Sequence, residues 1–220
     1  MTLSEKAYNA LRQDIIRGAL EQGRPLRMAE LSARYDMGFS PLREALNRLQ
    51  SERLVVAEAL RGFKVAPLSQ AEMRDAIDTR ILVETAALRA AIAQGGDDWA
   101  AGIVATLYAL KLQVDRRDTE ADIWELEARH YAFHRALLAA CGSPWKLEFF
   151  DRLYAATERY RIPILLNRAG GQGRDIQGEH AALAEATLAR DADLATHLLR
   201  QHYQRSAEII GRSMQAEFAL

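Results

Sequence analysis

The sequence has almost no cysteine, which excludes one common source of stability. Its single thiol, Cys141, cannot form an internal disulfide, and this usage is typical of a reducing compartment. Beside Gly142 we interpret Cys141 as a small buried side chain, with a redox sensor as the alternative.

Long apolar runs are missing too. The longest fall far short of the roughly 20 residues that cross a bilayer, and no charged-then-apolar leader opens the chain. We therefore expect an unprocessed cytoplasmic protein that makes no membrane contact. With 49% hydrophobic and 27% charged residues, the 220-residue chain has the composition of an ordinary globular protein of one large or two modest domains.

Net charge is low, at −1, but it is unevenly divided along the chain. Residues 1–66 hold eleven Lys and Arg against eight Asp and Glu, whereas the remainder holds eighteen against twenty-two. A basic first third joined to an acidic remainder is typical of a small DNA-binding module followed by another domain. Because this excess of positive charge in residues 1–66 is small, the positions of the charged residues are stronger evidence than their number.

Three helices are predicted in the first third. The first runs from about Ser4, its predicted N-cap, to Gly18, with apolar residues at helical spacing. A short second helix covers residues 28–35, and a tight turn at residues 36–38 follows it. The third helix begins at Ser40-Pro41, with serine as N-cap and proline at the first helical position.

A β-hairpin is predicted next. Leu54–Ala57 and Phe63–Ala66 are short apolar runs with turn residues between them. Helix, helix-turn-helix and hairpin in this order predict a winged helix-turn-helix. In such a domain the second paired helix enters the major groove of DNA, while the wing touches the backbone or the minor groove.

Beyond the hairpin the pattern is wholly helical. Breaks at residues 95–96, 141–144 and 170–173 separate the helices, and no segment has the strand period. The expected helices cover about residues 70–94, 97–116, 121–140, 144–168, 174–190 and 191–214. The fold class is therefore mainly α, with a winged helix-turn-helix over residues 1–66, a linker at 67–70 and an all-helical bundle over 71–220.

Motifs in both parts resemble known families. The first part resembles the GntR superfamily of transcription regulators, through Leu11-Arg12, Ile15–Gly18, Leu26, Leu31, Ser40–Leu49, Leu54-Val55 and Gly62–Val65. The second resembles the FadR-type effector domain, a helical bundle called FCD, through Arg80–Glu84, Phe133-His134, Glu179-His180 and Ala189–Asp191 leading to His202. The resemblance covers nearly the whole chain, and it implies a dimeric, ligand-responsive repressor.

A narrower resemblance concerns the effector. Met37–Arg43, Arg129–Leu137 and Cys141–Ser143 look most like the carbon-starvation-induced group of these regulators. That group represses glutarate and 4-aminobutyrate utilisation genes and responds to five-carbon dicarboxylates. The resemblance therefore implies a small carboxylate effector, such as glutarate or a related dicarboxylate.

Candidate DNA contacts lie around the third helix. Arg43, early in that helix, could bind a guanine edge with both arms of its guanidinium, as the resemblance also implies, and the alternative is an ion pair with Glu44. Ser40 could contact a phosphate, and three further cations are candidates for the DNA backbone, namely Arg48, Arg12 and Lys64. Gly38-Phe39 stands where many relatives have Ser-Arg, so their operator sequences cannot be assumed here.

Dimerisation is expected from the physics of operator binding. One half-site binds weakly, whereas two linked DNA-binding domains multiply the affinity. We therefore expect a homodimer that presents two such domains to a pseudo-palindrome in double-stranded DNA.

All five histidines lie in the second part. His130 and His134 share one helical face, and three helices could bring them together with His180 and His202 in a site suited to Zn²⁺ or Ni²⁺. The alternative is that each histidine is a separate core or surface residue, as we expect for His197. The family's metal site, with Asp or Asn and then three histidines, implies His134, His180 and His202 as ligands. His130 stands where many relatives have the carboxylate, so it would either bind softer metals or leave the metal weakly held.

Candidate effector contacts are mostly arginines. Arg80 comes first by position and family likeness, and its alternative is a structural salt bridge to Glu84. Arg159, Tyr160 and Arg161 are adjacent, so only some of them can face inward. Three large aromatics are expected to pack in the core rather than stack on a ligand, namely Trp124, Trp145 and Phe149.

Two other functions compete with an allosteric repressor. In a metal-sensing regulator the metal itself would be the signal. A metal-dependent hydrolase would use three histidines on zinc, but it lacks an evident general base, because Glu179 is expected on a different helix face from its neighbour His180. We therefore expect a regulator and not an enzyme.

Overall fold

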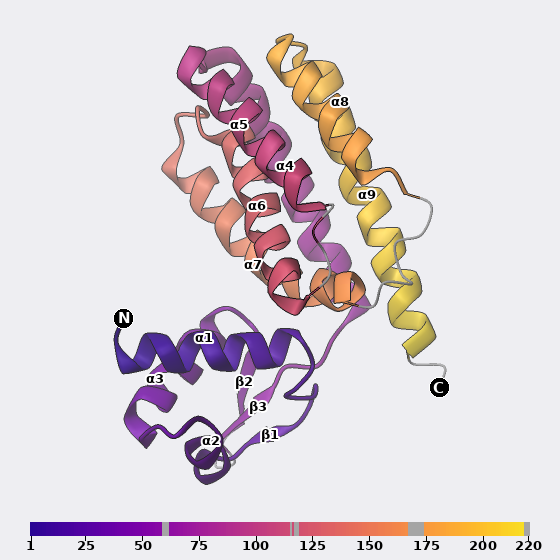
Figure 1. Ribbon diagram of the computed structural model, residues 1–220. Helices are drawn as coiled ribbons and strands as arrows, with labels where there is room; N and C mark the ends of the chain where they lie inside the picture. The colour runs from indigo at the N-terminus through magenta and orange to yellow at the C-terminus, as the bar shows by residue number, and fades with distance from the viewer. Residues whose placement is uncertain (59–61, 115, 117–118, 167–173, 218–220) are drawn as a thin grey trace.

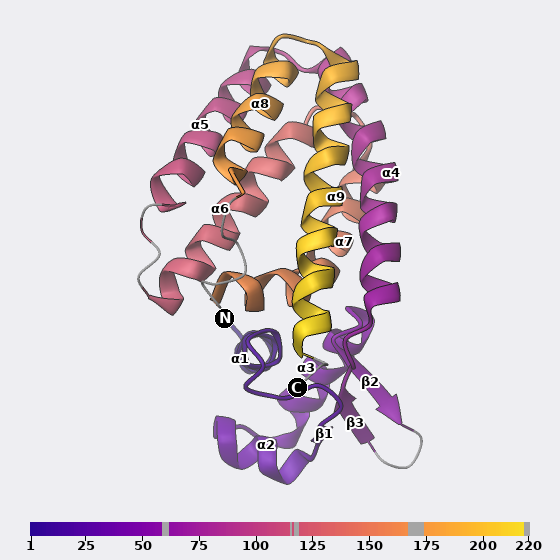
Figure 2. The same ribbon diagram turned by 90° about the vertical axis from the view of Figure 1, so that its right-hand side faces the viewer.

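The computed structural model describes the chain except for residues 59–61, 115, 117–118, 167–173 and 218–220. Its elements form two groups (Figures 1 and 2): α1 to β3, here called the head, and α4 to α9, here called the bundle. This is the mainly α fold class predicted from the sequence. The tip of the hairpin and the glycine-rich segment at 170–173 lie outside the described residues.

The head helices are α1 (Leu3–Ile16), α2 (Met28–Tyr35) and α3 (Phe39–Ser51). Thr2, not Ser4, caps α1: its hydroxyl accepts from Glu5 N at 3.1 Å, and the Glu5 carboxylate accepts from Thr2 N at 2.6 Å. This reciprocal box needs an acid three residues after the cap, which Thr2 has and Ser4 lacks. The prediction for Ser40 is also wrong, because Gly38 is the N-cap of α3 and no side chain caps it.

The predicted hairpin is present as β2 (Val55–Glu58) and β3 (Gly62–Val65), which pair antiparallel with Val56 opposite Lys64. A third strand, β1 (Pro25–Leu26), pairs with the other edge of β3, so the sheet order is β1-β3-β2. Two residues are too few to show the alternation that predicts a strand, so β1 was missed.

A compact apolar cluster holds the head together. On α3 the apolar residues recur at helical spacing, so one face of the helix is buried and the other is left to solvent. The buried members of the cluster are Ala7, Leu11, Ile15, Leu20, Leu26, Leu31, Leu42, Ala45, Leu46, Leu49, Leu54, Val55 and Val65.

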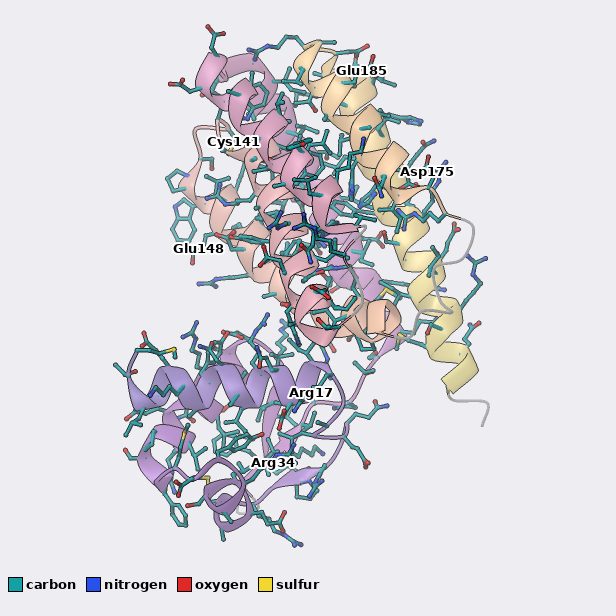
Figure 3. All side chains as sticks on the ribbon, viewed as in Figure 1. Arg17, Arg34, Cys141, Glu148, Asp175 and Glu185 are labelled. Atoms are coloured by element: carbon teal, nitrogen blue, oxygen red, sulfur yellow. The ribbon has the colours of Figure 1, made fainter. Side chains whose placement is uncertain are left out.

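The bundle follows the predicted helix order closely. Its helices are α4 (Gln70–Gln94), α5 (Asp97–Val114), α6 (Glu120–Leu138), α7 (Pro144–Leu166), α8 (Ile176–Leu188) and α9 (Ala192–Glu217). Side chains cap the starts of several of them: Ser69 accepts from Glu72 N, Thr119 from Asp122 N, and Asp175, labelled in Figure 3, from Gly178 N. Ser143 and Asp191 do the same before α7 and α9, accepting from Lys146 N and Leu194 N. Among the described residues, no helix has the length and apolar character needed to cross a membrane.

A second, separate apolar cluster fills the bundle, and α4 packs along both α7 and α9. Head and bundle meet where α1 faces α7, as Figure 1 shows. Cys141 is buried in the bundle core, as expected. The expectation for Trp145 and Phe149 is wrong: they are 70% and 46% exposed, because both lie on the outer face of the first turns of α7.

Candidate functional site

Four histidines meet inside the bundle. His130 and His134 come from α6, His180 from α8 and His202 from α9, and one ligand atom from each lies within 4.8 Å of the others. His134, His180 and His202 are buried, and His130 is half-buried. His197 lies on the exposed side of α9, so the structure brings together the four predicted histidines and leaves out the fifth.

The inner nitrogens of this cluster lie close to one another. Nε2 of His180 is buried without a hydrogen-bond partner, and Nε2 of His130 lies 3.1 Å from Nε2 of His134. Burial, reinforced by the neighbouring imidazoles, holds the pKa of His130 and His134 well below its usual range, and burial does the same for His180. Neutral imidazoles with inward lone pairs fit a divalent cation such as Zn²⁺.

The outer nitrogens are held by hydrogen bonds. His130 Nδ1 lies 2.7 Å from the Tyr154 hydroxyl, His134 Nδ1 lies 3.1 Å from the Tyr203 hydroxyl, and His202 Nδ1 lies 2.9 Å from Glu179 Oε2. The Tyr203 hydroxyl in turn donates to Glu84. Partners of this kind fix the orientation of a metal-binding imidazole and raise its basicity.

Glu179 is closer to the cluster than the sequence indicated. Its carboxylate contacts the outer nitrogen of His202 and accepts from Arg174 and Arg205, with Arg205 Nη1 at 3.0 Å. Burial alone would raise the pKa of Glu179, but these hydrogen bonds outweigh it and hold the pKa well below its usual range. Since it faces the outer side of His202 and is fully engaged, Glu179 is placed to orient His202 and not to act as a general base.

Two arginines border the histidines. Arg80 is buried and donates to Glu84 at 2.7 Å, to Thr157 at 3.0 Å and to the Tyr203 hydroxyl at 2.9 Å. It therefore makes the salt bridge given as its alternative and also lies one side chain away from His134. Arg161 donates to Glu127, with Nε to Oε2 at 3.2 Å, and lies 4.6 Å from the centre of the Tyr154 ring.

The other two effector candidates lie elsewhere. Arg159 donates to two backbone carbonyl oxygens beside the head, those of Arg53, at 3.0 Å, and Ala66. Tyr160 packs beside Arg159 under the start of α4, and its buried hydroxyl has no hydrogen-bond partner. The sequence predicts that only some of these three residues face inward. Arg161 borders the histidines, whereas Arg159 and Tyr160 contact other parts of the chain, because a helix rotates by about 100° per residue.

Arg43 lies on the exposed face of α3 and makes no hydrogen bond or ion pair with any described residue. The alternative pairing with Glu44 does not form, since Glu44 accepts instead from Ser4. Ser40 is exposed in the first turn of the same helix. A free guanidinium at this place is suited to a base edge or a phosphate.

The remaining DNA candidates are already engaged. Arg12 of α1 forms a two-armed pair with Glu158 of α7, so it joins the head to the bundle. Arg48 Cζ lies 3.6 Å from the centre of the Tyr8 ring, and Arg48 Nε lies 3.4 Å from Glu52 Oε1. Lys64 pairs with Glu58 across the hairpin. All three cations would have to leave these partners to bind the DNA backbone.

Two family models match the two parts of the chain. The model of bacterial regulatory proteins of the gntR family matches residues 3–65, and the FCD domain matches residues 75–205. The chain belongs to the GntR family and carries an FCD domain.

Relatives of this GntR-family protein agree with the assignment. It is 40% identical over 212 residues to the HTH-type transcriptional repressor GlaR of Escherichia coli K12, covering 94% of this chain and 95% of the relative. It is 38% identical over 212 residues to the HTH-type regulator BphR of Paraburkholderia xenovorans LB400, covering 95% and 85%. The solved structure of E. coli McbR/YncC shares the fold, with TM-score 0.77 at 20% identity over 97% of this chain and 99% of that one. The GntR-family protein is thus a transcriptional repressor and not an enzyme.

Sequence reasoning missed the partners of the histidines in this GntR-family protein. Tyr154 and Tyr203 contact the histidines and Glu127 pairs with the bordering Arg161, yet these residues lie far apart along the chain. Only Glu127 carried a signal, because it precedes His130 by three residues and so shares its face of α6. The tyrosines have no spacing that separates them from ordinary core residues.

Proposed function

We propose that the chain is a sequence-specific operator-binding repressor that a small carboxylate, bound beside a divalent metal in the bundle, releases from DNA. The observation that carries the proposal is the cluster of four histidines with an unpartnered inner nitrogen, bordered by arginines. We assign residues 1–66 to DNA binding, 67–70 to the linker and 71–220 to effector binding and dimerisation, and expect the protein to act in the cytoplasm, where its operator lies.

The proposed metal ligands are His134, His180, His202 and His130. A set of imidazole nitrogens without a carboxylate favours Zn²⁺ or Ni²⁺ over ions that prefer oxygen. A divalent metal in this place supplies a Lewis-acid seat for a carboxylate oxygen. Tyr154, Tyr203 and Glu179 keep three of the rings, those of His130, His134 and His202, turned inward through their outer nitrogens.

Arg161 and Arg80 are the proposed effector contacts. The Arg161 side chain is 17% exposed, whereas that of Arg80 is 3% exposed, so Arg161 is the one a ligand can reach first. A carboxylate that binds Arg161 competes with Glu127, while Arg80 is held through Tyr203 and Thr157. Effector binding therefore has to rearrange contacts made by α7.

Helix α7 is the proposed route of the signal. Tyr154 contacts His130, and Thr157 accepts from Arg80 on the side of the site. Glu158 and Arg159 bind the head directly. A small shift of this helix therefore changes both the site and the head contact, and an effector needs to favour one arrangement by only a few kcal/mol.

On the DNA side, Arg43 and Ser40 are the proposed contacts, with the β2–β3 hairpin as the wing. Two heads in a homodimer would bind a pseudo-palindromic operator. Sedimentation at micromolar concentration should show a dimer, and a monomer would contradict this part of the proposal.

The test is a fluorescence-anisotropy titration of the chain's own promoter with a panel of small carboxylates that includes glutarate. One or more dicarboxylates should weaken DNA binding, and chelation followed by Zn²⁺ addition should remove and restore that response. If saturating carboxylates leave the affinity unchanged with metal present, effector release fails.

A metal-sensing regulator is the second candidate, since the histidine set is complete without any organic ligand. Titrating Zn²⁺ or Ni²⁺ into the chelated protein without carboxylate separates the two. A change in operator affinity with metal alone favours the sensor, and a change only when carboxylate is also present favours the effector mechanism.

A further inference from the structure

Phe39 is an aromatic side chain without an apolar partner in the head core. It is the first residue of α3, and it is 52% exposed. The other head aromatics, Tyr8, Tyr35 and Phe63, all pack against the apolar cluster of the head, whereas Phe39 is not among its described contacts. The cluster is thus complete without this ring.

The position of Phe39 points to DNA. Arg43, the free guanidinium of α3, follows Phe39 by four residues and so lies on the same face one turn later. One helical turn advances about 5.4 Å, and successive base pairs are about 3.4 Å apart. Whatever base pair Arg43 contacts, the ring lies within one or two base pairs of it.

The chemistry of the major groove limits what this ring can bind. A phenyl ring neither donates nor accepts, and the one apolar group that base edges display in the major groove is the thymine methyl. We propose that Phe39 contacts a thymine 5-methyl group next to the base pair bound by Arg43, and so sets a thymine preference in each half-site. This inference rests on the proposed operator binding by α3.

Deoxyuridine tests the contact at the level of a single methyl group. A binding duplex is first selected from a randomised library with the full-length protein. Each thymine is then replaced by deoxyuridine, which keeps every hydrogen-bonding group. We expect one position per half-site at which the wild-type protein loses roughly 3- to 5-fold in affinity, as for one buried methyl.

Variants identify the side chain responsible. Phe39→Ala should bind the thymine duplex more weakly and show no further loss at that position, whereas Phe39→Leu should keep part of the sensitivity. Leu82→Ala, which truncates a 72% exposed apolar side chain of the bundle, is the matched control and should behave as wild type. Equal unfolding temperatures confirm that the variants fold.

Three results have distinct meanings. If no wild-type selection yields a bound duplex, the proposed operator binding fails. If the protein binds but no deoxyuridine substitution matters, the methyl contact is overturned. It is also overturned if Phe39→Ala keeps the same sensitivity as wild type, because another side chain then makes the contact.

Discussion

The head and the bundle treat buried polar groups differently. In the head, Asp14 is 5% exposed and is surrounded by donors: Arg34 Nη2 at 2.6 Å, the Tyr35 hydroxyl at 2.8 Å, and Arg17. Figure 3 labels both arginines in the head. Among the described residues, the buried side-chain atoms without a partner all lie in the bundle, at Arg159, Tyr160 and His180. The described buried polar side-chain atoms of the head therefore all have hydrogen-bond partners, whereas those three atoms of the bundle remain able to bond to another group.

The largest expected effect is a metal response confined to the bundle. Zn²⁺ added to chelated protein should stabilise the folded state by about 4 kcal/mol at a thousandfold excess over the dissociation constant. His180→Ala should abolish most of this gain, measured by calorimetry. His197→Ala, on the exposed side of α9, is the matched control and should respond like wild type. A full response in His180→Ala would remove the proposed site.

The next effect concerns the exposed guanidinium of Arg43, which has no partner among the described residues of the head. Arg43→Ala should cost about 1–3 kcal/mol of operator affinity, with no change in unfolding temperature, because the side chain has no partner among the described residues. Anisotropy titration at physiological salt measures this. Arg89→Ala, which removes an exposed arginine of the bundle, should bind as wild type. Unchanged binding by Arg43→Ala would remove its role.

A smaller effect tests how much the hydrogen bonds of buried Asp14 stabilise the head. Burial raises the pKa of Asp14, but hydrogen bonds from Tyr35 and Arg34 outweigh it and lower the pKa below its usual value. The stabilisation is therefore complete above about pH 5 and is lost as the pH falls through 4 and below. Asp14→Asn should cost about 1–2 kcal/mol at pH 7, since Arg34 is partly exposed.

Chemical denaturation at pH 7 and pH 3.5 checks this prediction. The difference in free energy of unfolding between wild type and Asp14→Asn should shrink at the lower pH. The two proteins should show the same stabilisation by metal at pH 7. An undiminished difference at pH 3.5 would show that packing, and not the carboxylate charge, explains the loss.

The smallest effect lies at the joint between the two regions. Glu158→Gln keeps an acceptor for Arg12, and burial already raises the pKa of Glu158, so the net change in stability should be about 1 kcal/mol or less. The substitution should nevertheless reduce the ratio between operator affinities with and without effector, because Glu158 lies on the proposed route. Glu148→Gln, on the same helix and paired with Arg152, is the control. An unchanged ratio would place the route elsewhere.

Local pattern predicted the helices and much of the site, but not its surroundings. Helical spacing placed His130 beside His134, and family resemblance added His180 and His202. The pairing of Arg12 with Glu158 joins residues 146 positions apart, and nothing local in the sequence indicates it. Arg159 shows the same limit: adjacency indicated that only some of residues 159–161 face inward, but not which, and the turn of the helix sends Arg159 and Arg161 to different regions.

Arg159 also has a consequence for how such repressors diversify. It holds the head through the carbonyl oxygens of Arg53 and Ala66, which belong to the main chain. Substituting those residues alters their side chains and leaves both acceptors in place. The exposed face of α3, which we propose binds the operator, can therefore change without a matching change at this contact, so DNA preference can diverge while the bundle stays the same.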